Sequence, residues 1–361
     1  AIFLVFLAVG VLVPFAIFFW RYNLLKSAQN LDSMLSREAA FLFNNLLLLG
    51  IAFVTLWGTV YPLISELGTG DTITVARPFY DQVNGPLFLA LVLLMGIGPL
   101  VPWRRANLAS LRRSLLWPVS GGLAAVAALL ILGIHRPYVL IGFGLCALVT
   151  TGIVWEWARG TRSRHRSSGE NYALAFWRLL MANRPRYGGY VVHLAVVMVV
   201  LGALGTTFFS VQRDVVLAPG ERAGIANYQI EYIGTTTTPK SDRTEFVSTL
   251  EVYRDGRLLT TMEATRSFYP SFNMAATRAA IRGGPVEDLY IVPSENLPDG
   301  SVGFRILVNP LMWWMWVAGP VLILGTVIAL WPQPVRQTAG ARSRAPATAR
   351  RRPAAARAAD A

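Results

Sequence analysis

Seven apolar stretches, each of about twenty residues, recur along the 361-residue chain and constrain its fold more than any other feature. A hydrocarbon core about 30 Å thick is crossed by about 20 apolar residues in a helix, so each stretch predicts one membrane span. Prolines at the starts of three stretches, Pro86, Pro137 and Pro310, suit the first turn of a helix, where no N–H is needed. The seven stretches are 1–20, 39–64, 86–102, 115–134, 137–157, 187–209 and 310–331.

Basic residues lie between these stretches rather than on one surface. The chain has 33 Lys and Arg against 20 Asp and Glu, yet only 15% of its residues are charged. Because Lys and Arg are retained on the cytoplasmic side, the connections that hold most of them are expected there. This distribution argues against nucleic acid as a partner. Four alternate connections hold 21 of the 33 basic residues, and these are 21–37, 104–113, 159–186 and 336–357.

The long connection at 210–309 is polar, with ten basic and twelve acidic residues, and is long enough to form a small domain. Its alternating apolar residues predict β-strands, and Asp255-Gly256 is a favoured hairpin turn. We expect a six-stranded open barrel or sandwich on the outer face of the membrane. The strands that can be placed are 228–233, 245–253, 257–266, 289–292 and 302–308.

These features predict an α-helical polytopic membrane protein of about seven transmembrane helices, with one small β-rich extracytoplasmic domain before the last helix. The expected divisions are helices 1 to 6 at 1–209, the β domain at 210–309 and the last helix at 310–331. Residues 332–361 are Ala, Arg and Pro without apolar periodicity, which predicts a disordered basic cytoplasmic tail. The chain opens directly in an apolar run without a basic leader or cleavage site, so we expect further sequence before it.

His193 is the one histidine inside a predicted span, near the start of the sixth. Ionisable groups within a bilayer are rare and are candidate functional sites, and imidazole is a common axial ligand of haem iron. Gly189 lies one helical turn earlier on the same face, where a missing side chain leaves room for a flat macrocycle. The alternative is a histidine hydrogen-bonded between helices that glycines allow to approach closely.

The other two histidines have simpler interpretations. His135 lies in a very short outer turn, where an exposed histidine is more often inert. His165 lies among three arginines, and a solvated cytoplasmic segment explains it.

Polar and aromatic residues in other spans are interpreted first as structural. Asn44 and Asn45 need hydrogen-bond partners inside a membrane, and contacts between helices explain them more simply than catalysis. Cys146 is the single cysteine, which excludes an internal disulfide framework and a CxxC redox motif in this chain. Two groups of tryptophans could stack on a planar ligand, but tryptophan is enriched at membrane surfaces generally, so we interpret both groups first as aromatic belts there. The groups are Trp155 and Trp157 around Glu156, and Trp313, Trp314 and Trp316.

Five strings follow one another in a specific order: SREAAFLFNNLLL at 36–48, GTVYPLI at 58–64, NRPRYGGYVVHL at 183–194, RSFYPSFNMAATRAAIRGGPVEDLYIV at 266–292 and NPLMWWMWVAGPVLILG at 309–325. Together they resemble the CcmF family of cytochrome c-type biogenesis proteins, the haem lyase component that attaches haem to apocytochrome c. The resemblance covers the chain from its start to about residue 331.

The resemblance implies that His193 is a transmembrane axial ligand of a bound b-type haem. It also implies that the second ligand, a tryptophan-rich segment and two external histidines precede the part of the family that this chain matches. No catalytic residue is then expected within these 361 residues, so whether the chain alone is an enzyme stays open.

The resemblance further implies partners and a location. Haem would arrive on the chaperone CcmE and be joined through thioether bonds to the cysteines of apocytochrome c, presented with CcmH. The haem held by His193 would pass electrons to the substrate haem. The expected location is the plasma (inner) membrane, with the β domain on the periplasmic face. The alternative function is a polytopic membrane transporter or an assembly scaffold without bound haem.

Overall fold

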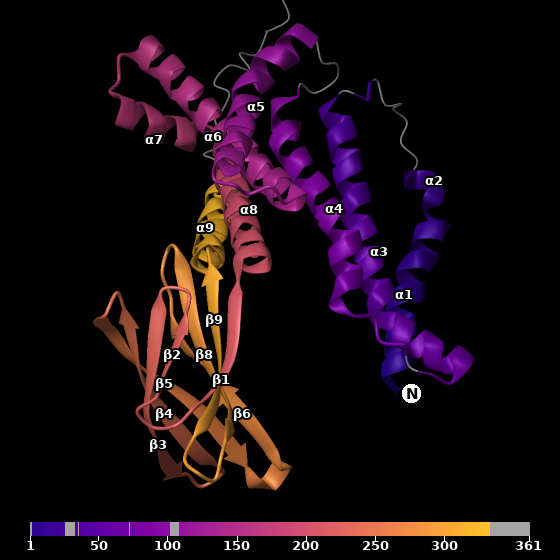
Figure 1. Ribbon diagram of the computed structural model, residues 1–361. Coiled ribbons are helices and arrows are strands. Elements are labelled where there is room, and N and C mark those ends of the chain that lie inside the picture. Colours follow the sequence, from indigo (N-terminus) through magenta and orange to yellow (C-terminus); the bar gives the residue numbers. More distant parts are fainter. Residues whose placement is uncertain (1, 26–32, 35, 72, 102–107, 333–361) are drawn as a thin grey trace, which may run out of the picture.

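The computed structural model describes residues 2–25, 33–34, 36–71, 73–101 and 108–332. Helices make up the part of the chain before residue 210, a β domain follows, and one more helix comes after it (Figure 1). The predicted tail at 332–361 lies outside the described residues, apart from Pro332.

Six helices in the described part are long and apolar enough to cross a membrane, which confirms a polytopic membrane protein. The first apolar stretch also forms a helix, α1 (Ile2–Trp20), followed by the short α2 (Tyr22–Leu25). The six long helices are α3 (Arg37–Thr69), α4 (Arg77–Ile97) with its extension η1 (Gly98–Leu100), α5 (Leu108–Ile131), α6 (Pro137–Ser168), α8 (Arg184–Phe209) and α9 (Met312–Leu330).

Two of the three prolines predicted to begin helices do not begin them. Pro137 is the first residue of α6, as predicted. Pro86 instead lies inside α4, which a membrane helix tolerates when its neighbours satisfy the freed backbone groups. Pro310 ends strand β9 (Val302–Pro310), and Leu311, in the left-handed conformation with φ 61°, separates that strand from α9.

Helix α6 continues well beyond the stretch predicted at 137–157. It runs through an arginine-rich segment to Ser168, since arginine is a good helix former, and ends at Gly169, whose φ is 69°. A helix that the sequence did not predict, α7 (Tyr172–Ala182), is capped by the side chain of Asn171 and packs back on α6. Much of the basic connection at 159–186 is therefore a helical hairpin.

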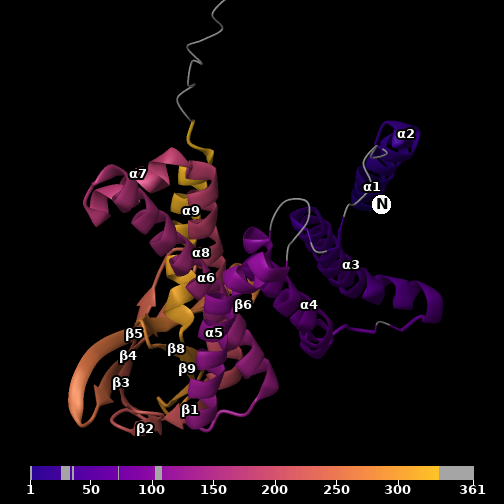
Figure 2. The ribbon, with the colours of Figure 1, turned by 90° about the horizontal axis from the view of Figure 1, so that it is seen from above.

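Helices α8 and α9 make the most extensive helix contact of the described chain and lie side by side in both views (Figure 1, Figure 2). Their backbones touch at two glycines. A Cβ at Gly188 would lie 2.5 Å from the backbone nitrogen of Ala329, and one at Gly325 would lie 2.8 Å from that of Val192. This close contact joins the two helices that connect directly to the β domain.

The β domain is a sandwich of two antiparallel sheets. One sheet has the strand order β1-β9-β8-β7 and the other β2-β3-β4-β5-β6. Its nine strands in the described chain exceed the six expected. The strands are β1 (Val211–Leu217), β2 (Arg222–Ile225), β3 (Tyr228–Pro239), β4 (Thr244–Arg254), β5 (Arg257–Tyr269), β6 (Met274–Arg278), β7 (Ala280–Arg282), β8 (Glu287–Asn296) and β9.

The predicted hairpin turn is confirmed and the missed strands have a common reason. Asp255 and Gly256 both have positive φ, 51° and 74°, as a tight turn between β4 and β5 requires. Strand β1 pairs with β9, far along the chain, and β2, β6 and β7 have five residues or fewer. Local alternation reveals neither a strand whose partner lies at the far end of the domain nor strands as short as these.

The side chains between the sheets form a closed core that includes Tyr232 and Phe304, whose rings meet edge to face at 5.3 Å. The domain is fixed to the helices at its base. Ser210 donates a hydrogen bond to the side-chain oxygen of Asn309 at 2.7 Å, and the Trp314 indole donates to the Pro285 carbonyl at 2.9 Å. Trp314 therefore helps to anchor the β domain to α9.

Candidate functional site

His193 lies on α8, which packs against α6, and residues of α4 line the same hollow as the histidine. Its side chain is half-buried, and within the described residues it makes no hydrogen bond and no ion pair. A histidine that serves as structural glue between helices would bond a neighbouring helix. The structure therefore does not bring a hydrogen-bonding partner to His193, which leaves its ring nitrogens available to a ligand.

A small hollow lies beside His193. Its volume of about 10 Å³ is close to the least that holds one water molecule. A porphyrin does not fit there. The hollow is lined by Met95, Gly96, Pro99 and Leu100 from α4 and η1, by Val149, Gly152, Ile153 and Glu156 from α6, and by Tyr190 and His193 from α8.

Glu156 is the acidic member of this lining and is 7% exposed. Arg159 donates to one of its carboxylate oxygens, and Arg186 donates to the other at 2.5 Å. Arg186 also donates to the Tyr190 hydroxyl at 3.2 Å. A buried carboxylate is stable only when it is paired and hydrogen-bonded, and this one is. Glu156 therefore ties α6 to the start of α8, about two turns before His193.

The two adjacent glycines of α8 have different surroundings. The backbone of α9 occupies the space beside Gly188, as described above. Gly189 has nothing within 4 Å of the position its Cβ would take among the described residues. Since Gly189 lies one turn before His193 on the same face, open space adjoins the histidine there.

These features fit a haem on one side of α8 only. The hollow is too small, so a flat macrocycle bonded to His193 would have to lie over Gly189. The unbonded imidazole supplies a nitrogen ligand of the kind haem iron takes, and the open glycine supplies room. Within the described chain, neither of the other two histidines, His135 and His165, lines the hollow beside His193.

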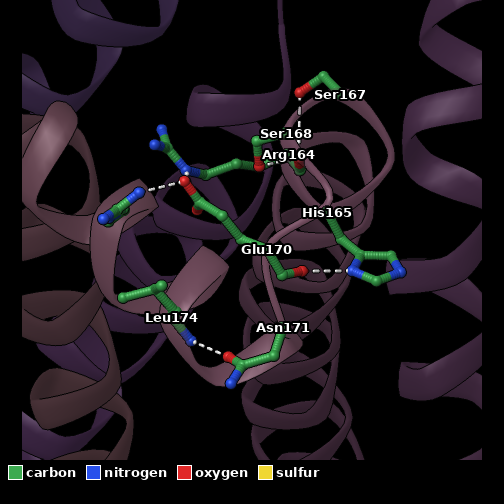
Figure 3. A network of polar contacts seen from close by, with 8 residues as sticks. Arg164, His165, Ser167, Ser168, Glu170, Asn171 and Leu174 are labelled. Carbon is green, nitrogen blue, oxygen red and sulfur yellow. Dashed lines mark hydrogen bonds and ion pairs between the residues drawn. The ribbon is translucent and has the colours of Figure 1, made fainter.

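His165 lies in the last turn of α6, beside the connection to α7 (Figure 3). Its Nδ1 lies 2.6 Å from the Glu170 carbonyl oxygen, and its ring stacks on Tyr172 with a centroid distance of 4.1 Å. Glu170 also binds Arg164 and Arg178, and the Arg164 hydrogen bond leads the effects that hold the pKa of that carboxyl below its ordinary value. His165 thus closes a turn. His135 is exposed and makes no hydrogen bond within the described chain.

The other predicted polar residues do not join the site. Asn44 is half-buried and Asn45 exposed on α3, and neither hydrogen-bonds another described residue. A buried amide that was not predicted from the sequence, Asn84 of α4, donates to the Thr55 hydroxyl of α3 at 3.3 Å. Asn84 precedes Pro86, where the predicted span begins, whereas α4 begins at Arg77 and so includes it.

The tryptophans divide between packing and surface positions. Trp155 stacks on Trp117 of α5 at 4.9 Å, and Trp157 meets Phe176 of α7 edge to face at 5.8 Å. Trp313 packs edge to face on Trp314, whereas Trp316 is exposed. None of them lines the hollow beside His193.

Comparisons with known proteins agree with one another. The family model described as the CcmF C-terminal beta-sandwich matches residues 208–310. The cytochrome c-type biogenesis protein ccl1 of Rhodobacter capsulatus is 31% identical over 87% of this chain and 47% of its own length. CcmF of Haemophilus influenzae is 29% identical over 92% of this chain and 50% of its own.

A solved structure titled cytochrome c haem lyase CcmF has the same fold, with a TM-score of 0.66 and 28% identity, over 83% of this chain and 46% of that one. The chain spans about half the length of the curated relatives it matches. The family match, the relatives and the shared fold all lead to one assignment. The chain belongs to the CcmF family of cytochrome c-type biogenesis proteins.

Proposed function

We propose that this chain is the haem-holding membrane part of a haem lyase that attaches haem to apocytochrome c, with His193 as an axial ligand of a b-type haem. The observation that carries the proposal is the half-buried, unbonded imidazole of His193 beside the open position at Gly189. The relatives, named for cytochrome c biogenesis, support the same process.

The residues around His193 hold it in place. The Gly188–Gly325 contact joins α8 to α9, and the Glu156–Arg186 ion pair joins α8 to α6, so the histidine is fixed from two sides. A ligand held rigidly before binding loses little entropy when it binds. A b-type haem, when bound, supplies reversible one-electron chemistry at its iron.

Covalent attachment needs cysteine sulfurs that this chain does not offer. Cys146 is 2% exposed on α6. The thioether sulfurs are therefore proposed to come from the CxxCH cysteines of apocytochrome c. Delivery of haem by CcmE and presentation of the apocytochrome by CcmH belong to the same proposal.

The proposed arrangement in the membrane follows from charge. The arginine-rich α6–α7 hairpin lies at the opposite end of α8 from the β domain (Figure 1). Basic connections are retained in the cytoplasm, which supports the proposal that the β domain lies on the periplasmic face of the inner membrane. The domain division at 1–209, 210–309 and 310–331 is supported by strands that begin at Val211 and end at Pro310.

The function is tested in cells that lack their own haem lyase and carry the full-length protein that contains this chain. His193→Ala should abolish covalent haem on a c-type cytochrome, while His165→Ala, which alters a turn far from the site, should leave it unchanged. Haem-stained gels of membrane fractions measure the outcome, with immunoblots for the protein level. Normal cytochrome assembly by His193→Ala would instead favour a scaffold without bound haem.

A further inference from the structure

The arginine-rich end of α6, up to Ser168, has two opposite faces with different surroundings. Helix α7 covers one face, where Trp157 meets Phe176 and His165 stacks on Tyr172. The opposite face is open and carries a hollow of about 550 Å³. Its lining repeats at helical spacing along one face of α6 and consists of Trp155, Arg159, Arg162, Ser163, Arg166 and Ser167.

Within the described residues, the neighbouring carboxylates pair with only one of the three arginines that line this hollow, Arg159. Glu156 is shared by Arg159 and Arg186, and Glu170 by Arg164 and Arg178, as Figure 3 shows for the Arg164 pair. Within the described residues, Arg162 and Arg166 form no ion pair and are exposed. Two free guanidinium groups one turn apart, with the Ser163 hydroxyl between them, present donors suited to phosphate oxygens.

The other end of the hollow is aromatic and lies at the edge of the membrane-spanning part. Trp155 stacks on Trp117 of α5 at 4.9 Å, and the preceding residue, Val154, is exposed. Tryptophan pairs of this kind lie where acyl chains meet headgroups. On the far side of α6, α7 also exposes Tyr172 and Trp177, as a helix lying along a membrane surface does.

We propose that the α6 hollow binds an anionic phospholipid. Arg162 and Arg166 bind its phosphate, and Trp155 packs against the start of an acyl chain at the α5–α6 contact. Charge complementarity favours an anionic headgroup, since basic pockets at the cytoplasmic ends of membrane helices take such lipids. A soluble phosphate would use the arginines but leave the aromatic end without a role.

The test measures lipid retention by the full-length protein. The protein is equilibrated in nanodiscs of mixed phosphatidylglycerol and phosphatidylcholine, and the lipids that remain bound are counted by native mass spectrometry. The unmodified protein should retain phosphatidylglycerol preferentially. Arg162→Gln/Arg166→Gln should lower that preference by roughly tenfold, and Arg162→Lys/Arg166→Lys should preserve part of it. Arg257→Gln/Arg266→Gln, with the same change of charge in the β domain, should leave it unchanged.

Three outcomes overturn the proposal. The first is a phosphatidylglycerol preference that is unchanged in Arg162→Gln/Arg166→Gln, and the second is an equal loss of that preference in the β-domain control. The third is displacement of the bound lipid by glycerol phosphate at the same concentration as the lipid, which would show a soluble-phosphate site. If the Gln pair does not purify, the salt dependence of the unmodified protein tests the proposal instead. Its preference for phosphatidylglycerol should fall as ionic strength rises. A preference that salt does not change would contradict the proposal. The haem spectrum should stay intact in the Gln pair, so this test is separate from that of His193.

Discussion

Aromatic side chains contact one another in both parts of the molecule, but they face different surroundings. In the β domain, Tyr232 and Phe304 are enclosed between the two sheets, and Phe304 is 1% exposed. On α3, the rings of Phe53, Trp57 and Tyr61 follow one another at 6.2 and 5.9 Å along the outside of the helix, and Phe53 is 63% exposed.

The difference follows from the solvent that each part meets. A domain in water must enclose its apolar side chains, because burying them is the main favourable contribution to its folding. A helix in lipid gains nothing by hiding them, so its contacts rely instead on small residues and a few polar groups. The close contacts at Gly188, and the Glu156 ion pairs, are the helical counterpart of the core around Phe304.

The largest effect is expected in the β core. Phe304→Ala should destabilise the β domain by about 3–5 kcal/mol, since it removes a fully buried ring. Phe53→Ala, the same change on the outer face of α3, should cost less than about 1 kcal/mol. Hydrogen exchange of backbone amides in the full-length protein measures both locally. Equal effects at the two positions would contradict the comparison.

An intermediate effect is expected at the helix contact. Gly188→Ala should destabilise the α8–α9 pair by about 1–3 kcal/mol, because the new methyl group meets backbone atoms of α9 that cannot move alone. Gly189→Ala, the matched change one residue later, meets open space in the haem-free protein and should not lower its unfolding temperature. Thermal unfolding followed by circular dichroism in detergent compares them. A larger loss for Gly189→Ala would show that the two glycines had been assigned in reverse.

The smallest effect concerns an exposed ion pair across the β1–β9 contact. Arg305 donates to Asp214 at 2.9 Å and is the main cause that lowers the pKa of Asp214 below its ordinary value near 3.8. A lowered carboxyl pKa stabilises the folded state above the unfolded pKa, and this contribution is lost as pH falls through the folded pKa.

Asp214→Asn should therefore loosen β1 slightly at neutral pH, because one strand-to-strand ion pair is missing. The difference from the unmodified protein should vanish in strong acid, where Asp214 is protonated in both states. Amide exchange of β1 measured across the acid range tests this prediction. A difference that persists in strong acid would assign the effect to packing rather than to charge.

Membrane spans and several strands could be predicted because length, hydropathy and alternation are local properties. The extent of α6 to Ser168 could not, since hydropathy stops at the first arginines while helix propensity continues. The hairpin turn at Asp255-Gly256 was predictable from two residues, whereas β1 depends on a partner strand at the far end of the domain.

The candidate site divides in the same way. His193 was found because an ionisable residue stands out inside an apolar stretch. The ion pair between Glu156 and Arg186 joins residues 30 apart in the chain and was not foreseen. Gly188 and Gly189 are the same residue type and adjacent in the chain. Only the position of α9 shows that the space beside Gly188 is occupied and the space beside Gly189 is open.

The central claim is that His193 is a haem ligand, and the visible absorption spectrum of the purified full-length protein tests it most directly. His193→Gly should abolish the b-type haem bands, and added imidazole should restore them by entering the vacated ligand position, while His165→Ala should keep them. Recovery with imidazole separates ligand loss from unfolding. A His193→Gly protein whose haem bands match those of the unmodified protein would contradict the claim.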